Sequence, residues 1–355
     1  MDTAQEMRRF SLESRRYIGC KTKLVDWIFG LIREQTHDVH SFCDIFAGTG
    51  VVAHRALQTY ERVVVNDFLH SNNVMYRAFF APDEWSEERV QTIINDFNDI
   101  NPAKIGENYF SKNFGGKYFY HETAKIVGYI RGRLQTLQKD LKDKEYAVLM
   151  ASLIYSIDRY ANTMGHFDAF HHKEPAAHLF QMRMIDAEMY DSVEIHQEDA
   201  NQLARHINVD LTYLDPPYNS RQYSRFYHVY ENLVQWKKPQ LYGAALKPKE
   251  ENMSDYCRHT AFKAFTDLVS HINSRYLVVS YNNTYYSKSS SSENKIKLEQ
   301  LEEVLCKCGE THVFNHEFKA FNSGKTEFND HREYLFITEV DDEKRNQSFP
   351  NVLRG

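Results

Sequence analysis

The hydrophobic positions near the start of the chain fall into short runs that are separated by turns. Residues 41–46 form an apolar run, residues 47–50 interrupt it with two glycines, and residues 51–57 resume with apolar side chains at helical spacing. Residues 62–67 then form a β-branched run that ends in an acid. A strand, a glycine turn, a helix and a second strand in this order predict an α/β fold with a doubly wound, Rossmann-like sheet.

Later strand-like runs are expected to complete this sheet, and they fall at residues 193–196, 211–214, 276–280 and 333–338. The stretch from residue 67 to residue 193 is different, because it is rich in helical patterns, aromatic side chains and basic side chains. It is also too long for an ordinary crossover between two strands. We therefore expect residues 1–70 and 191–345 to form the sheet domain and residues 71–190 to form an inserted, mainly helical subdomain.

The composition is that of an ordinary globular protein, with 355 residues of which 42% are hydrophobic and 26% are charged. No stretch approaches the roughly 18–20 uninterrupted apolar residues of a membrane span. The first residues are polar and acidic, unlike a signal peptide. Five scattered cysteines argue against a disulfide framework and fit a reducing compartment. We expect a cytoplasmic protein without a membrane partner, and a loop at the serine-rich residues 287–292.

The charge pattern leaves two interpretations open. A net charge of −6 does not indicate a nucleic-acid-binding protein, because such proteins are more often basic. Positive charge is nonetheless concentrated in one segment, whose basic residues are Lys112, Lys117, Lys125, Arg131, Arg133, Lys139, Lys142 and Lys144. This segment either contacts a polyanion or forms a solvated helix face.

The sequence Asp215-Pro216-Pro217-Tyr218, directly after the run at residues 211–214, combines an acid, a rigid turn and an aromatic ring. These groups suit the methylation of an exocyclic amine such as that of adenine, whose nitrogen lone pair is delocalised into the ring. Asp215 and the Pro216 carbonyl could each accept a hydrogen bond from the amine, while Tyr218 stacks on the base. The alternative is a strand end followed by an ordinary turn.

A glycine turn at the end of the first strand is a candidate cofactor loop. It consists of Phe46, Ala47, Gly48, Thr49 and Gly50. Glycines let backbone N–H groups approach a ligand closely, and the helix that follows favours an anionic group at its N-terminus. The dinucleotide-binding fingerprint GxGxxG is absent because position 53 is alanine. A plain tight turn remains the alternative.

Two further acids follow strands at positions that suit a nucleoside. Asp67 could accept hydrogen bonds from the two hydroxyl groups of a ribose, and Asp199 could bond an adenine amino group. Each could instead cap a helix or close a turn. The glycine turn and these acids together indicate a nucleoside-bearing cofactor. S-adenosylmethionine fits better than a dinucleotide, because its methyl group gives the Asp215 turn a reaction to perform.

Four motifs in this order resemble the D12 class of N6-adenine DNA methyltransferases, the alpha group that includes the Dam enzymes; they are residues 17–24, 46–50, 66–67 and 215–218. Residues 219–223 and 280–283 look like the type II restriction-modification members of that class. The resemblance implies a Rossmann-like, S-adenosylmethionine-dependent catalytic domain. It also implies that the segment before Asp215 contains the target recognition domain.

The resemblance implies roles for the N-terminal motif and the cofactor loop. Tyr17 and Lys21 would lie beside the cofactor, Gly48 and Gly50 would form the cofactor loop, and Asp67 would hold the ribose. Cys20 stands where related proteins often have glycine or asparagine. Without the resemblance, Tyr17 is equally suited to core packing and Lys21 to an exposed position.

Candidate DNA-binding residues lie in three places: Lys112 and Lys117 in the basic segment, His166 in the aromatic loop at residues 162–172, and Arg221 and Tyr223 after the catalytic turn. The loop could have no such role, and Arg221 could stabilise a local turn. Three histidines and an acid in this loop match no standard zinc spacing. Cys306 and Cys308 have no second pair of ligands after them. We therefore expect no metal.

These features predict a site-specific, S-adenosylmethionine-dependent adenine-N6 methyltransferase that acts on a flipped adenine in double-stranded DNA. The resemblance also allows a cognate restriction endonuclease that acts on the same site without forming a stable complex with this chain. RNA adenine-N6 methylation is an alternative, because the same turn would accept adenine from either polymer. A catalytically silent DNA-binding regulator with the same fold is another.

Overall fold

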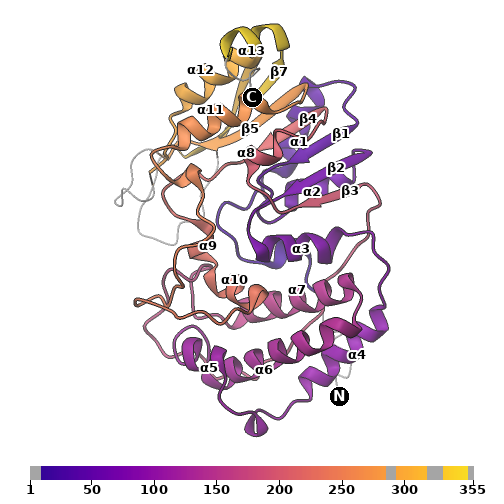
Figure 1. The fold of residues 1–355 in the computed structure, drawn as a ribbon, viewed down its shortest axis with the longest axis vertical. Helices are drawn as coiled ribbons and strands as arrows, with labels where there is room; N and C mark the ends of the chain where they lie inside the picture. Colours follow the sequence, from indigo (N-terminus) through magenta and orange to yellow (C-terminus); the bar gives the residue numbers. More distant parts are fainter. Residues whose placement is uncertain (1–8, 285–292, 318–330, 351–355) are drawn as a thin grey trace. The chain divides into compact units, whose positions relative to one another are not determined.

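A computed structural model describes residues 9–284, 293–317 and 331–350 (Figure 1). The loop expected at residues 287–292 lies outside the described residues. The chain forms two compact units. A helical unit contains the described residues of Met1–Gly19, Leu69–Asp191 and Tyr223–Glu251, and a sheet unit contains those of Cys20–Phe68, Ser192–Gln222 and Asn252–Gly355.

The sheet unit is built on a seven-stranded sheet with the order β3-β2-β1-β4-β5-β7-β6. The strands are β1 (Ser41–Asp44), β2 (Arg62–Asn66), β3 (Val193–His196), β4 (Leu211–Leu214), β5 (Tyr276–Asn282), β6 (Gly309–Glu317) and β7 (Arg332–Val340). The first five strands pair in parallel, whereas β7 runs antiparallel to both β5 and β6. The mixed α/β, Rossmann-like fold class predicted from the sequence is confirmed.

Successive residues of a strand point to opposite faces of the sheet. Consecutive residues of β1, β2 and β4 are buried, so both faces of the sheet are covered. On one face, Phe42 of β1 stacks on Phe29 at 5.9 Å between ring centroids. On the other face, Cys43 joins a buried cluster that includes Leu203, Phe265 and Leu305. The helices of this unit are α1 (Val25–Gln35), α2 (Val51–Leu57), α8 (Ala200–Leu203), α11 (Ala261–His271), α12 (Leu298–Cys308) and α13 (Asp342–Ser348).

The strand order reverses between β1 and β4, and this reversal determines where a ligand can bind. In open α/β sheets the connections leave β1 and β4 in opposite directions, so a crevice forms outside their carboxyl ends. Asp44 ends β1, and Asp215 directly follows β4. The acids predicted to be functional at positions 67 and 199 follow β2 and β3 at the same edge.

The strand β6 was not predicted from the sequence. Most of its residues are exposed or half-buried, and among the described residues it pairs with β7 alone, at the end of the sheet. Apolar and polar residues alternate along a strand when one face is buried. An edge strand that is exposed to solvent on both faces lacks this alternation. Only the antiparallel pairing of β6 with β7, from Gly309 to Glu317, identifies this segment as a strand.

The helical unit is organised around a buried helix, α7. Its helices are α3 (His70–Phe80), α4 (Glu87–Asn98), α5 (Tyr109–Phe114), α6 (His121–Leu137), α7 (Asp143–Tyr160), α9 (Tyr223–Phe226) and α10 (His228–Gln235). Most residues of α7 are buried, and α3, α4 and α6 pack against it. A helix that is buried on nearly all sides is the core of its unit.

This unit is assembled from three segments, whereas the sequence pattern suggested a single insertion at residues 71–190. The N-terminal segment joins through backbone hydrogen bonds between Phe10 and Met184, at 3.0 Å, and between Asp186 and Phe10, at 2.8 Å. Helix α10 joins because the buried Glu231 carboxylate accepts the N–H of Ser71 at 2.7 Å, at the start of α3. A carboxylate is stabilised there by unpaired N–H groups.

Within the residues that the structure describes, no helix has the length and apolar character needed to cross a membrane.

Candidate active site

Asp215 lies at the carboxyl end of β4 in a cluster of buried charged groups. All four residues of β4 are buried, so the chain emerges from the core at Asp215. Its Oδ1 atom lies 3.0 Å from the Lys21 ammonium group, and its side chain is 17% exposed. Lys21 in turn lies 3.0 Å from Oε1 of Glu333. One ammonium group is thus shared by two carboxylates.

Lys21 is buried between these carboxylates, so the alternative of an exposed lysine does not apply. Its carbonyl accepts the N–H groups of Leu24 and Val25 at 2.7 and 3.0 Å, which places it at the turn that leads into α1. Burial is the largest effect on the Lys21 pKa and lowers it, but the charges of Asp215 and Glu333 together raise the pKa above its ordinary value. Lys21 is therefore a buried cation.

Glu333 was not identified from the sequence. It lies near the start of β7 and pairs with Asn282 at the carboxyl end of β5, because the two strands are antiparallel. Its Oε1 atom accepts a hydrogen bond from Ser280 at 2.6 Å and lies 3.1 Å from the Tyr218 hydroxyl oxygen. A charged residue within an otherwise apolar run was the available signal. Only the strand direction brings it to Asp215.

The environment raises the pKa of Asp215 to about 6. Burial is the main cause, because it disfavours the charged form. The Lys21 charge lowers this pKa, and the negative charge of Glu333 raises it again. A carboxyl group with this pKa exchanges its proton near neutral pH, where an ordinary aspartate is fully ionised.

Tyr218 is bonded into the same cluster through its hydroxyl group. The hydroxyl donates to Asp215 Oδ1 and accepts from Lys21. Burial raises the pKa of Tyr218 well above its ordinary value, which keeps it a neutral phenol. Its ring meets the ring of Tyr281 edge-on at 4.8 Å, and its carbonyl accepts the N–H of Lys295 at 2.7 Å. These contacts fix the turn that follows Pro216 and Pro217.

The predicted cofactor loop is a tight turn with two left-handed glycines. Gly48 has φ 53° and Gly50 has φ 82°, a conformation that residues with a Cβ rarely adopt. The Gly50 N–H donates to the Ala47 carbonyl at 2.7 Å. Phe46 packs edge-on against Tyr256 at 5.0 Å, and Thr49 is buried. The loop thus leads from β1 directly into α2.

Asp67 contacts this loop, because its Oδ2 atom accepts the Gly48 N–H at 3.1 Å. Asp67 is half-buried at the end of β2. Asp199 is exposed and accepts the N–H groups of Asn201 and Gln202 at 3.0 and 3.3 Å, so it caps α8. Both acids therefore have structural contacts, and their contacts with a cofactor stay a prediction.

Asp44 is a further acid at this edge that the sequence analysis did not single out. It is buried at the end of β1, where the backbone N–H groups of Ala53 and Phe46 interact with its carboxylate. Burial, followed by the negative charge of Asp215, raises the Asp44 pKa well above its ordinary value. Because burial disfavours the charged form of this acid, a ligand that brings a positive charge would stabilise the ionised carboxylate.

The predicted residues Tyr17 and Tyr223 lie together in the helical unit. The Tyr17 ring stacks on Tyr227 at 4.5 Å and on Tyr223 at 5.5 Å. The Tyr223 hydroxyl donates to the Ile18 carbonyl at 3.3 Å. Aromatic packing of Tyr17, one of the two interpretations of the sequence, is therefore present.

The other candidate DNA contacts differ in how accessible they are. Lys112 is exposed at the end of α5, whereas the Lys117 ammonium group donates to the Ala244 carbonyl at 3.2 Å. His166 is buried and stacks on Phe226 at 4.7 Å between ring centroids. The backbone N–H of Arg221, in the sheet unit, donates to the Asn219 side chain at 3.1 Å. Their contacts with DNA stay a prediction.

Two members of the basic segment are structural. Arg131 is buried and donates to the Leu233 and Val234 carbonyls, and burial lowers its pKa. Lys144 is also buried, donates to the carbonyl of Ala81, and has a pKa that burial lowers to about 8. Neither interpretation of the basic segment, a solvated helix face or a contact with a polyanion, applies to these two buried residues.

The sheet order, the glycine turn and the acid at the end of β4 define a Rossmann-like methyltransferase. The sequence model of the D12 class N6 adenine-specific DNA methyltransferases matches residues 17–288, and the chain belongs to this family. The predicted resemblance is confirmed. Members of this class use S-adenosylmethionine, so the expected cofactor is confirmed as well, and DNA is the substrate of the family.

Relatives of known function are type II methyltransferases. M.FokI of Planomicrobium okeanokoites is 29% identical over 92% of this chain and 53% of its own length, so the chain spans about half of that protein. M.CviAII of Paramecium bursaria Chlorella virus 1 is 28% identical over 92% of this chain and 98% of its own. M.NlaIII of Neisseria lactamica is 27% identical over 91% of this chain and 98% of its own.

Among solved structures, a putative rRNA methylase from Clostridium thermocellum aligns with a TM-score of 0.33 and 10% sequence identity over 91% of this chain and 100% of its own. This likeness is too weak to add to the conclusion.

Lys21→Met should destabilise the protein, because it leaves Asp215 and Glu333 as buried acids without their shared cation. Removing one partner of a buried ion pair costs about 3–5 kcal/mol in the free energy of unfolding. Urea titration at neutral pH, followed by circular dichroism, measures this loss. The matched comparison is Lys21→Met/Glu333→Gln, which carries one buried acid fewer and should recover part of the stability. Equal stability of the single and double variants would contradict the shared ion pair.

Proposed function

We propose that this chain transfers a methyl group from S-adenosylmethionine to the N6 atom of a specific adenine in double-stranded DNA, as the modification enzyme of a restriction-modification system. One observation carries the proposal: Asp215 lies at the switch point of the sheet, after β4, and is held there by Lys21. Family membership and the type II relatives support the same activity.

The proposed clamp on adenine uses the part of Asp215 that the protein leaves to a substrate. Lys21 and Tyr218 both contact Oδ1 of Asp215. We assign Oδ2 to one N–H of the target amine and the Pro216 carbonyl to the other. Two acceptors on these N–H bonds draw the nitrogen lone pair out of the ring conjugation, which makes the nitrogen a better nucleophile.

Tyr218 is proposed to stack on the flipped adenine, since base–aromatic stacking contributes about 1–3 kcal/mol. Its ring is already fixed from one side by Tyr281 and its hydroxyl by Asp215 and Glu333. A ring that is held in place loses little entropy when a base binds. Orientation of the amine is therefore the main contribution of this turn to the rate.

Residues at the neighbouring strand ends fit the methyl donor. The glycine turn at Gly48 and Gly50 admits a close approach of the backbone, and Asp67 offers a carboxylate to the ribose. The buried carboxyl group of Asp44, at the end of β1, is proposed to face the ammonium group of the cofactor's methionine moiety. When bound, S-adenosylmethionine supplies an electrophilic methyl group on a positively charged sulfur.

Methylation leaves an additional proton on the target nitrogen, and this proton goes to Asp215 or to water. With a pKa of about 6, Asp215 can accept it near neutral pH and release it again. Lys21 stabilises the ionised form of Asp215 between turnovers and lowers its pKa. The negative charge of Glu333 acts in the opposite direction and raises that pKa. Together with burial, these two opposing charges leave the pKa of Asp215 at about 6.

The helical unit is proposed to select the target sequence. It contributes the exposed Lys112 as a phosphate contact. Lys117, His166 and Tyr223 are further candidates, and each would have to contact DNA in addition to the protein group that it contacts now. Arg221 in the sheet unit completes this set. A cognate endonuclease that recognises the same site, and a cytoplasmic location where the DNA is accessible, follow from the proposed restriction-modification role.

Modified-base sequencing tests this function directly. DNA from cells that express the chain should contain N6-methyladenine at one sequence motif, and DNA from cells that express Asp215→Ala should not. Loss of the amine acceptor should lower the rate of tritiated methyl transfer by at least about 10²-fold. Asp26→Ala, at an exposed acid, is the control with unchanged activity. Methylation of structured RNA with no methylation of duplex DNA would overturn the choice of polymer.

Asp67→Ala should weaken the binding of S-adenosylmethionine by about 10- to 100-fold, because a hydrogen bond to a charged group contributes roughly 1.5–3 kcal/mol. Calorimetry without DNA measures this effect separately from catalysis. Asp67→Asn keeps an acceptor for the Gly48 N–H and so separates the shape of the loop from the carboxylate charge. Unchanged affinity in both variants would remove Asp67 from the cofactor site.

The pH dependence of kcat/KM should show an acid limb near pH 6. Below this pH, Asp215 carries a proton and loses an acceptor oxygen; above it the carboxylate is ionised, so kcat/KM should rise with pH and then level off. Steady-state rates measure the profile. Glu333→Gln should move the limb to lower pH, since the negative charge of Glu333 raises the pKa of Asp215. A limb that stays in place or moves upward would contradict this coupling.

A further inference from the structure

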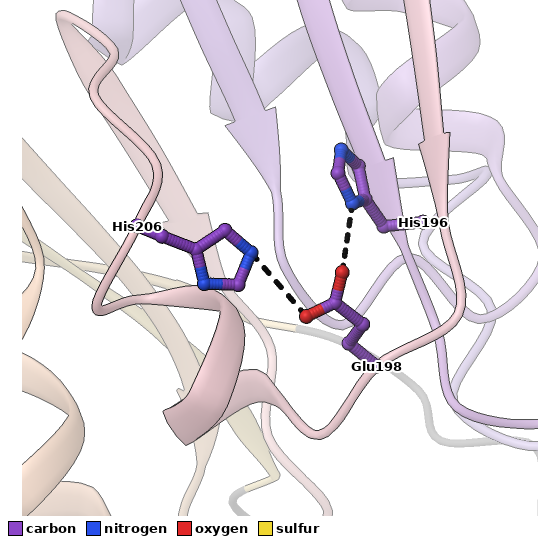
Figure 2. A group of neighbouring side chains, drawn as sticks. All are labelled: His196, Glu198 and His206. Atoms are coloured by element: carbon purple, nitrogen blue, oxygen red, sulfur yellow. Dashed lines mark hydrogen bonds and ion pairs between the residues drawn. The ribbon is translucent and has the colours of Figure 1, made fainter.

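Three side chains beyond the carboxyl end of β3 converge in the sheet unit, outside the cluster around Asp215. Nδ1 of His196 lies 3.1 Å from Oε1 of Glu198, and Nε2 of His206 lies 3.3 Å from Oε2 of the same carboxylate. One ligand atom from each residue can be chosen so that all lie within 4.8 Å of one another. Figure 2 shows the Glu198 carboxylate between the two imidazole rings.

Backbone contacts hold this arrangement independently of the three side chains. The Glu198 N–H donates to the side chain of the buried Asn66 at 3.0 Å, and the Asn66 amide donates back to the Glu198 carbonyl at 3.1 Å. His206 follows α8, where its N–H donates to the Leu203 carbonyl at 3.1 Å. The short capped helix α8 thus turns the chain so that His206 returns to Glu198.

A second carboxylate lies on the far side of the His196 ring. Oε2 of Glu194 is 3.9 Å from Nε2 of His196. Glu194 is itself held by Arg62, which donates to its two oxygens at 2.7 and 3.1 Å. Imidazoles that bind metals commonly donate their other ring N–H to a carboxylate, and Glu194 is a nearby carboxylate, although 3.9 Å is longer than a hydrogen bond. This leaves Nδ1 of His196 facing Glu198.

We propose that His196, Glu198 and His206 bind a zinc ion. Two imidazole nitrogens and one carboxylate oxygen form a ligand set suited to Zn²⁺, whereas Mg²⁺ and Ca²⁺ prefer oxygen ligands. His206 is 54% exposed, so water has access to a fourth position. In this proposal the ion is structural and links β3 to the segment after α8. The site stands apart from the proposed function and does not depend on it.

Sequence spacing did not indicate this site, because His196 and Glu198 are separated from His206 by a helix and match no standard zinc motif. The competing interpretation is a surface network in which Glu198 merely bonds two histidines. Such a network needs no ion, and exposed ion pairs contribute little stability. The two interpretations differ in whether the protein binds zinc with a defined stoichiometry.

Calorimetric titration of the full, untagged, metal-free chain with Zn²⁺ tests the proposal. One ion should bind per chain, and His206→Ala and Glu198→Gln should each weaken zinc binding at least about tenfold. A tenfold loss is the lower limit, because even residues that only orient a metal ligand typically cost about 10- to 100-fold in affinity when they are replaced. Glu198→Gln preserves size if His206→Ala folds poorly. The exposed thiol of Cys306 is removed in all variants by Cys306→Ser.

The matched control is His40→Ala. His40 and Glu61 form a histidine–carboxylate pair at 3.2 Å, and no third ligand joins them among the described residues. This variant should bind zinc as the parent chain does. Cobalt bound at the site should give visible d–d absorption that His206→Ala abolishes. No stoichiometric binding, equal affinity in the parent and both cluster variants, or binding of Mg²⁺ in preference to Zn²⁺ would overturn the proposal.

Discussion

The ion pair between Lys21 and Asp215 is the interaction on which the site at the end of β4 depends. A carboxylate in this buried position is costly, because burial raises its pKa. Lys21 lowers that pKa, while the Glu333 carboxylate lies 3.0 Å from the same ammonium group. Lys21 therefore has to reach the end of β4 before Asp215 can be an ionised acceptor at neutral pH, and Glu333 opposes this effect.

The strand order explains why these groups meet. Reversal of the sheet between β1 and β4 places Asp44 and Asp215 at neighbouring strand ends, and antiparallel β7 brings its first residues to the same edge. Parallel strands place all their carboxyl ends together, so acids after β2 and β3 also lie on this edge. The chemistry of the family follows from this common edge rather than from any one motif.

The helical unit shows how charge in a sequence can mislead. Arg131 and Lys144 belong to a basic segment that resembled a surface for a polyanion, yet both are buried and donate to backbone carbonyls. Their long side chains satisfy carbonyl groups that would otherwise be buried without a donor. Exposed members such as Lys112 remain the better candidates for contacts with phosphate. Burial, not composition, separates the two roles.

The sequence by itself determined every strand except β6, the glycine turn and the Asp215 turn, because short strand-like runs and turn residues are local signals. It also determined the family, through the order of its motifs. Edge strand β6 lacked such a signal. Only the tertiary structure decided that Glu333 shares Lys21 with Asp215 and that His206 returns to Glu198. Those contacts depend on strand direction and chain reversal, which local sequence patterns do not encode.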